Sequence, residues 1–88
     1  MHGEYKVQGG KLVVVDLDNI NDRLTNVQVH GDFFLEPAEA LDDIRTSLEG
    51  LPVISTVEDI VAAIRAGLRP GAEMIGFSPE AVAIAEIG

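Results

Sequence analysis

The segment from residue 27 to residue 37 constrains the fold most, because the spacing of apolar residues changes there. Before it, residues 11–30 carry apolar side chains at alternate positions, as β-strands do. After it, Leu41, Ile44 and Leu48 recur at the spacing of one helix face. Strands followed by helices predict an α+β domain. We expect two layers, with a small antiparallel sheet of two to three strands followed by about three helices packed on one of its faces.

The clearest predicted strand places Val13, Val15 and Leu17 on one face. Its first half is apolar on both faces, so we expect it to be central or covered on both sides. A turn cluster follows at residues 19–22. In the next strand the alternation slips, which predicts either a bulge near residues 25–26 or a later start of that strand. The predicted strands are residues 4–7, 11–18 and 23–30, with a short piece at 33–35.

End signals place the helices. Pro37 suits the first position of a helix, where its missing N–H costs nothing. Gly50 suits a left-handed cap at the end of that helix, and Gly67 ends the next one. Further signals are the capping-box spacing of Ser55 and Glu58 and the N-cap pattern Ser78-Pro79. The expected helices begin at Pro37, Thr56 and Pro79.

The composition bounds the function. The 88 residues make one domain, residues 1–88, which leaves little apolar surface to enclose a deep pocket as well as a core. A binding module or a subunit of a larger assembly is therefore the expectation. A net charge of −9 repels nucleic acid and anionic lipid, and no apolar run is long enough to span a membrane. The lack of cysteine fits a cytoplasmic protein.

No pattern of residues predicts a catalytic or metal site. Asp16, Asp18 and Asp22 lie close in sequence, but no register gives the ligand spacing and glycine of a calcium-binding loop. His2 and His30 lack the spacing of zinc ligands, so we interpret each as a surface histidine. The serines are explained by caps or by an exposed helix side, and none lies in a nucleophile elbow: they are Ser47, Ser55 and Ser78.

A glycine turn between two lysines is one candidate binding element. Lys6 and Lys11, the only lysines in an acidic chain, flank Gly9 and Gly10. Backbone N–H groups of such a turn, with a cation nearby, can meet a phosphate or a carboxylate. An ordinary hairpin turn would have the same sequence, so both interpretations stay open.

The second candidate element is the Gly-Asp-Phe-Phe sequence at residues 31–34. Gly31 allows a bulge or a close backbone approach, and Asp32 can accept local N–H bonds. Phe33 and Phe34 point to opposite sides of an extended chain, so we expect one ring to fill the core. The other ring is then a candidate interface anchor, since aromatic side chains concentrate binding energy.

Taken together, these elements resemble the accessory (C-terminal) domain of lipoate–protein ligases. The resemblance rests on Val-x-Val-x-Gly-Asp-Phe-Phe at residues 27–34, followed by Glu-Pro and a helix that ends in Leu-x-Gly. Residues 6–12 resemble the lysine–glycine–glycine–lysine segment of the versions encoded as a separate small subunit. Residues 77–82 fit the last helix of that domain. The resemblance covers nearly the whole chain.

The resemblance implies a non-catalytic subunit of a two-part ligase, forming a heterodimer. In that family the catalytic subunit binds lipoate and ATP with magnesium and forms lipoyl-adenylate. It then transfers the lipoyl group to a lysine of a lipoyl acceptor domain, which is a further candidate partner. This chain would bind no cofactor alone. The resemblance places Lys6, Gly9, Gly10 and Lys11 near the adenylate and assigns Gly31, Asp32, Phe33 and Phe34 to the fold or the subunit contact.

A different class of function remains as the alternative. A small acidic α+β domain of this kind also suits a scaffold or a module that binds a carrier protein and has no connection with lipoate. The two hypotheses differ in whether this chain stimulates the activation of lipoate by a catalytic subunit.

Overall fold

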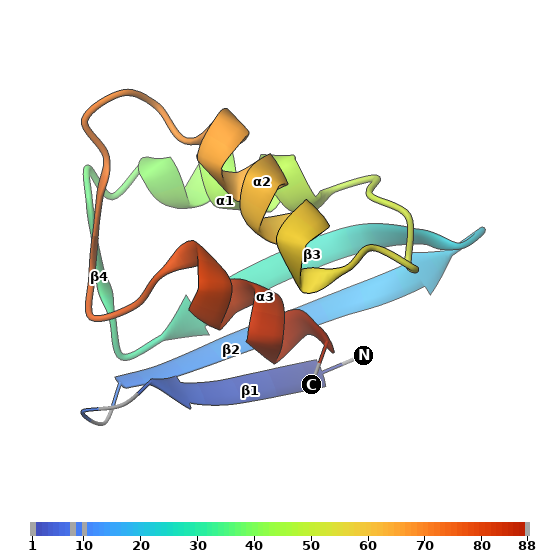
Figure 1. Cartoon of the computed structure of the whole chain (residues 1–88), viewed down its shortest axis with the longest axis horizontal. Coiled ribbons are helices and arrows are strands. Elements are labelled where there is room, and N and C mark those ends of the chain that lie inside the picture. Colours follow the sequence, from blue (N-terminus) through green and yellow to red (C-terminus); the bar gives the residue numbers. More distant parts are fainter. Residues whose placement is uncertain (1, 8, 10, 88) are drawn as a thin grey trace.

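The computed structural model describes residues 2–7, 9 and 11–87, and for Ile87 the backbone only. Its main sheet has three antiparallel strands in the order β1-β2-β3, and β4 and β5 form a separate two-stranded ribbon. Three helices complete the described part (Figure 1). The strands are β1 (His2–Val7), β2 (Lys11–Ile20), β3 (Arg23–Gly31), β4 (Phe34–Glu36) and β5 (Glu73–Ile75). The helices are α1 (Ala40–Leu48), α2 (Val57–Gly67) and α3 (Pro79–Ile87).

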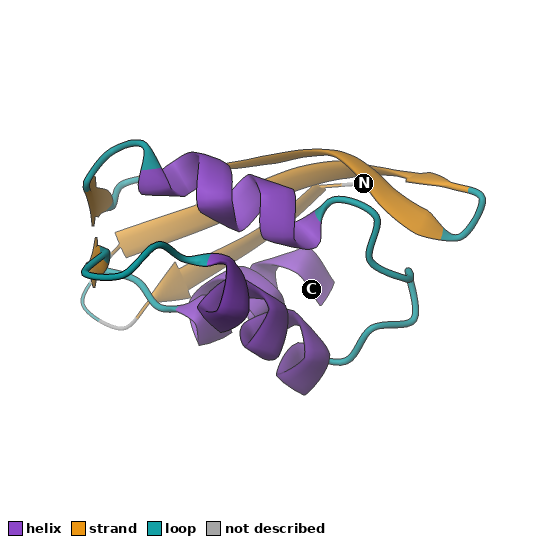
Figure 2. Cartoon of the chain, turned by 90° about the horizontal axis from the view of Figure 1, so that it is seen from above, coloured by secondary structure: helices purple, strands orange, loops and turns teal. Residues whose placement is uncertain are grey.

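This architecture confirms the predicted α+β fold. The helices gather on one side of the main sheet (Figure 2). There α3 packs on β1 and β2, α1 packs on β3, and α2 lies against both other helices. The core forms between these layers because Val13 and Val15 of β2 face Ile44, Ile64 and other apolar helix residues, all almost fully buried. Strand β2 is central, as its apolar first half predicts.

The β2–β3 hairpin turns more tightly than predicted. Strand β2 continues through Ile20, which pairs with Arg23, so the turn comprises only Asn21 and Asp22. Their φ angles of 54° and 61° are those of a two-residue hairpin turn, and Asn and Asp tolerate this region better than other non-glycine residues. The predicted turn over residues 19–22 is therefore wrong by two residues at its start.

The predicted bulge is confirmed at Asn26, whose φ is 51°. One residue of β2 there lies opposite two residues of β3, because Asp16 pairs with Gln28 and Asp18 pairs with Thr25. At the bulge, two backbone N–H groups of β3 donate hydrogen bonds to a side chain at the end of α1 instead of to β2. The N–H groups of Asn26 and Val27 donate to the two carboxylate oxygens of Glu49 at 2.7 and 3.0 Å.

Helix α1 begins at Ala40 and not at Pro37, so that prediction is wrong. Glu36 still pairs with Glu73 in the ribbon, and Pro37 follows it across a cis peptide bond. Residues 37–39 form a turn in which Ala40 N–H donates to the Pro37 carbonyl at 3.0 Å. At the other end, Gly50 has a φ of 83°, which confirms the predicted cap.

The capping box of α2 lies one residue later than predicted. The Asp59 N–H donates to the Thr56 hydroxyl at 3.2 Å, and the Thr56 N–H donates to the Asp59 carboxylate at 3.1 Å. Ser55 lies one residue before this cap, and its hydroxyl donates to the Pro52 carbonyl at 2.6 Å. At the start of α3 the prediction is confirmed, since the Ala81 N–H donates to the Ser78 hydroxyl at 3.1 Å.

No helix in the described part of the chain is long and apolar enough to cross a membrane.

Candidate functional site

The two candidate elements predicted from the sequence line one depression. It has a volume of about 530 Å³ and opens to solvent at the end of the main sheet where β1 turns into β2. Gly9 and Lys11 line it from the hairpin. Residues 31–34 line it from the end of β3. Gly10 lies outside the described residues, so its predicted role has no structural counterpart here.

Gly31 brings the two elements together through a close backbone contact. Its φ is 152°, and a Cβ added there would lie 1.9 Å from the carbonyl oxygen of Leu12. The next residue, Asp32, donates its backbone N–H to that same carbonyl at 3.0 Å. Because only glycine allows this approach, the chain leaves β3 directly against the start of β2. Asp32 and Lys11 therefore line the same depression.

The two lysines project to opposite faces of the β1–β2 hairpin. Lys6 pairs with Leu12 and Lys11 pairs with Val7, and neighbouring residues of a strand point to opposite sides. Lys11 therefore shares the helix side of the sheet with Val13. Its aliphatic stem lies over Gly76, where an added Cβ would sit 3.1 Å from Lys11 Cγ. Lys11 lines the depression, whereas Lys6 is exposed on the other face.

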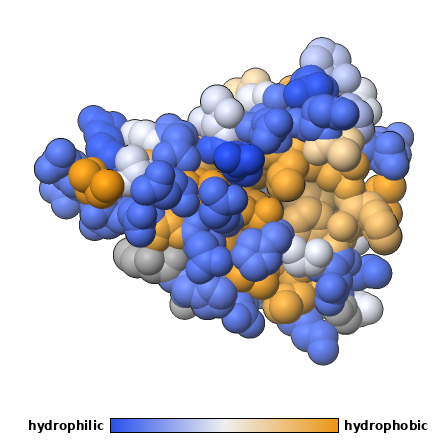
Figure 3. Space-filling model, turned by 180° about the vertical axis from the view of Figure 1, so that it is seen from behind, coloured by the Kyte–Doolittle hydropathy of each residue, from blue (hydrophilic) through white to orange (hydrophobic). Residues whose placement is uncertain are grey.

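The two phenylalanines divide as predicted between core and surface. Phe33 is partly buried and stacks on Phe77, which is itself buried. Phe34 is 67% exposed and lines the rim of the depression. Figure 3 shows that hydrophobic side chains gather at this broad end of the molecule, whereas hydrophilic ones predominate at the narrow opposite end.

A cluster around Asp16 is a feature that sequence reasoning missed. His2 Nδ1 lies 2.5 Å from Asp16 Oδ1, and His30 Nε2 lies 3.2 Å from Asp16 Oδ2. His2 Nε2 also lies 2.7 Å from a carboxylate oxygen of Glu4. Hydrogen bonds to Glu4 and Asp16 raise the pKa of His2, and those from His2 and His30 lower the pKa of Asp16. Only the strand register could have revealed this cluster, because it joins three strands.

These residues are surface histidines and acids, as the sequence predicts. Within residues 2–7, 9 and 11–87, no group of three histidine or acidic side chains is arranged to hold a metal ion. The serine hydroxyls are likewise engaged with the backbone. That of Ser47 donates to the Asp43 carbonyl at 2.6 Å, and those of Ser55 and Ser78 make the bonds described above.

A second cavity contains a carboxylate that the sequence did not single out. It has a volume of about 220 Å³ and lies between the start of β3, the loop before α2 and Glu86 of α3. Both carboxylate oxygens of Glu86 are buried and have no hydrogen-bond partner among the described residues. Burial raises the pKa of Glu86 to about 7, because the charged form loses its hydration. An acid at the end of an apolar helix gives no sequence signal of this environment.

Comparison with known proteins connects this fold to lipoylation. No protein-family model matches the chain, and no curated protein matches it significantly. Among solved structures, it is similar to a chain of an archaeal lipoylation system, described as a bi-partite lipoate protein ligase and its E2 lipoyl domain from Thermoplasma acidophilum. The two chains share 27% sequence identity with a TM-score of 0.70. The similarity covers 98% of this chain and 97% of that one, so the chain resembles one component of a lipoylation system over almost its whole length.

Proposed function

We propose that this chain is the accessory subunit of a two-part lipoate–protein ligase. In this role it supports a catalytic subunit during the ATP-dependent activation of lipoate to lipoyl-adenylate. The lipoyl group then passes to a lysine of an acceptor domain. The observation that carries the proposal is the nearly complete mutual coverage with a chain from a bi-partite ligase system. The resemblance of residues 27–34 and 6–12 to the accessory domain supports the same role.

The depression suits a contribution to a shared site. It is open rather than enclosed, and its cation is Lys11, held beside a glycine turn in a chain of net charge −9. A lone cation in an acidic surface can approach an anion that a second subunit binds. Phosphate, carboxylate and mixed anhydride groups of the activation step are all anions of this kind. ATP, magnesium and lipoate would be bound by the catalytic subunit.

The test mixes the chain with the cognate catalytic subunit, lipoate and ATP with magnesium. Lipoyl-adenylate is measured by mass spectrometry, and pyrophosphate release gives the rate. We expect adenylate to form rapidly only when both chains are present. Equal formation without this chain would refute the proposal and favour a scaffold unrelated to lipoate activation.

The archaeal lipoylation system of the matched chain also includes an E2 lipoyl domain, and one feature here favours an acceptor role as a second candidate function. Lys6 and Lys11 are both exposed beside a hairpin turn, and an acceptor must present a lysine to the ligase. The mass of this chain, measured after the same reaction, distinguishes an accessory subunit from an acceptor. An accessory subunit keeps its mass, whereas an acceptor gains one lipoyl group on Lys6 or Lys11.

A further inference from the structure

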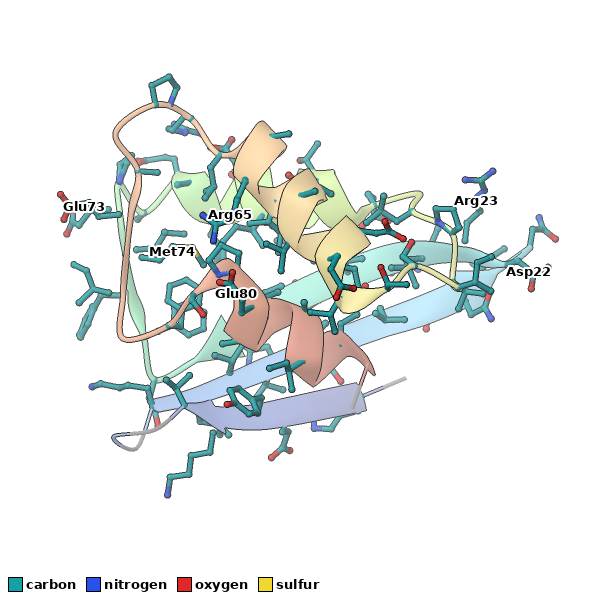
Figure 4. All side chains as sticks on the ribbon, in the orientation of Figure 1. Asp22, Arg23, Arg65, Glu73, Met74 and Glu80 are labelled. Carbon is teal, nitrogen blue, oxygen red and sulfur yellow. The ribbon has the colours of Figure 1, made fainter. Side chains whose placement is uncertain are left out.

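The β4–β5 ribbon presents two kinds of side chain on its outward face. Phe34 pairs with Ile75, Leu35 with Met74 and Glu36 with Glu73. Alternate residues of a strand point to opposite faces, so the middle pair turns inward, where Leu35 is buried and Met74 is partly buried. Figure 4 shows Glu73 pointing away from the body of the molecule and Met74 pointing toward it. The outer pairs form the ribbon quartet: Phe34, Ile75, Glu36 and Glu73.

The apolar half of the ribbon quartet is unusually exposed. Phe34 is 67% and Ile75 is 47% exposed, and they lie directly opposite each other on adjacent strands. A cross-strand pair of this type stabilises a sheet when its side chains are shielded from water. Here both side chains face solvent, in a ribbon of only three residues per strand. Covering this pair would bury apolar surface around an aromatic anchor, which is typical of a binding hot spot.

The acidic half of the ribbon quartet is suited to contact with a cation. Glu36 and Glu73 lie directly opposite each other, and like charges in that position destabilise a strand pair. Neither glutamate belongs to an ion pair in the described part of the chain. A lysine or arginine placed between the two carboxylates would relieve their repulsion. The ribbon quartet therefore fits a surface that offers an apolar hollow beside a basic side chain.

We propose that the ribbon quartet is the docking surface for the catalytic subunit of the ligase. This inference rests on the proposed function, and it adds which face meets the partner and what chemistry that partner carries. Phe34 belongs both to the ribbon quartet and to the rim of the depression that Lys11 lines. A subunit that covers Phe34 therefore also closes one side of the depression. Docking at the ribbon quartet places Lys11 at the joint between the two chains.

A second copy of this chain is a poor occupant of the same surface. A two-fold dimer through this face would bring one ribbon quartet against another, because such contacts are self-complementary. Four glutamates would then meet at one interface between chains that each carry a net charge of −9. The repulsion favours a basic partner over self-association.

The experiment measures the affinity of the catalytic subunit for variants of the full chain by titration calorimetry. Phe34→Ser with Ile75→Ser should weaken binding at least about tenfold, because it removes the apolar anchor. Ile54→Ser is the matched control, since Ile54 is 86% exposed but lies outside the ribbon. Circular dichroism verifies that each variant is folded. If the double variant does not fold, the single variant Phe34→Ser is tested instead, because the Phe34 side chain makes little contact with the core.

A second pair of variants tests the charge. Glu36→Gln with Glu73→Gln should weaken binding several-fold and flatten its dependence on salt. The control is Glu58→Gln, which removes one exposed acid from the start of α2. Salt dependence that stays as steep as in the original chain would overturn the basic-partner part of the proposal.

The outcomes separate this inference from the proposed function. If the unaltered chain binds and stimulates activation while the ribbon variants bind as tightly as it does, the docking proposal fails and the accessory role stands. If the unaltered chain does not bind the catalytic subunit, both fail. Selective loss of binding in the ribbon variants, with Ile54→Ser unaffected, supports the docking surface.

Discussion

Phe33 stacks on Phe77, with ring centroids 3.9 Å apart and an angle of 20° between the ring planes. Phe33 follows β3 and Phe77 precedes α3, so the contact joins the chain leaving the sheet to the last helix. It lies directly under the depression, because Phe33 also lines that space. The stack therefore holds the exposed Phe34 in place by fixing its neighbour.

The stack predicts measurable coupling between the two rings. Phe33→Leu and Phe77→Leu should each lower the free energy of unfolding, and the double variant should lose less than the sum. We expect a coupling energy of about 1 kcal/mol from a double-mutant cycle in urea. Phe34→Leu is the control and should change stability by less than about 0.5 kcal/mol, because that ring is exposed. Additive losses for the two core rings would contradict the stack as a stabilising contact.

Gly67 predicts a steric effect that helix propensity alone would miss. Alanine normally stabilises a helix relative to glycine by roughly 0.5–1 kcal/mol. Here a Cβ on Gly67 would lie 1.9 Å from the hydroxyl oxygen of Ser47 in α1. We therefore expect Gly67→Ala to destabilise the protein by about 1–3 kcal/mol, measured by thermal or urea unfolding. Ser47→Ala removes this hydroxyl without placing a glycine in α1 and should recover part of the loss in the double variant. A stabilised Gly67→Ala would show that α1 and α2 do not cross so closely.

The opposite directions of the lysines predict unequal effects on activation. Lys11→Ala should slow adenylate formation by about tenfold or more, because it removes the cation of the depression. Lys6→Ala should have a smaller effect, since Lys6 lies on the other face of the hairpin. Lys11→Arg keeps the charge and should retain most of the rate. If all three variants keep both the fold and the activation rate of the original chain, the glycine–lysine segment acts only as an ordinary hairpin turn.

Glu86 predicts that stability falls as the pH rises through the neutral range. The pKa of Glu86 is raised from 4.5 to about 7 in the folded chain. A carboxyl that binds its proton more tightly when folded contributes most below the unfolded pKa, and that contribution is lost between about pH 4.5 and pH 7. The full difference corresponds to about 3 kcal/mol, and we expect roughly half of it because Glu86 as a whole residue is only partly buried, although its carboxylate oxygens are buried.

Urea unfolding of the chain and of Glu86→Leu at pH 5 and pH 8 measures this effect. The original chain should lose stability between the two values through this group, and the variant should lose less. Carboxyl titration by NMR gives the pKa directly. A value near 4.5 for Glu86 would show that its carboxylate is hydrated in the folded protein.

Asp43 provides a titration test of how α1 is held to the turn after α2. Its carboxylate accepts from Arg69 Nε at 2.7 Å, Nη2 at 3.1 Å and the Arg69 backbone N–H at 3.0 Å. The side-chain bonds to Arg69, and then the backbone bond, hold the pKa of Asp43 below its usual value. Arg69→Gln should move the pKa of Asp43 back toward the ordinary value in an NMR titration. An unchanged pKa would mean that the guanidinium does not contact this carboxylate in solution.

The parts of the fold that follow from local physics could be predicted from the sequence. The alternation of Val13, Val15 and Leu17 placed the central strand, because period-two burial is visible in the residues themselves. Gly50 and Ser78 acted as expected since caps depend on neighbouring backbone only. Pro37 failed as a helix start because its neighbour Glu36 pairs with Glu73, a contact made by a distant segment. Local end signals contain no information about such a contact.

The candidate site was predicted in pieces but not as one surface. Lys11 and residues 31–34 stood out separately, and the strand register that pairs Val13 with Gly31 brings them together. Ile75 gave no signal, because a three-residue strand has too few positions to show a period. Glu86 and the Asp16 cluster depend on packing and on register, respectively, which a single sequence does not display.

Gly3 lies so close to α3 that an added Cβ would be 1.7 Å from the carbonyl oxygen of Ala85. The first strand and the last helix are thus in backbone contact, and Figure 1 shows the start of β1 beside the end of α3, far from β4 and β5. A tether attached at the start of β1 or at the end of α3 would leave from the same corner of the molecule. Immobilised on a sensor surface by such a tether, the chain would present the ribbon quartet and the Lys11 depression outward.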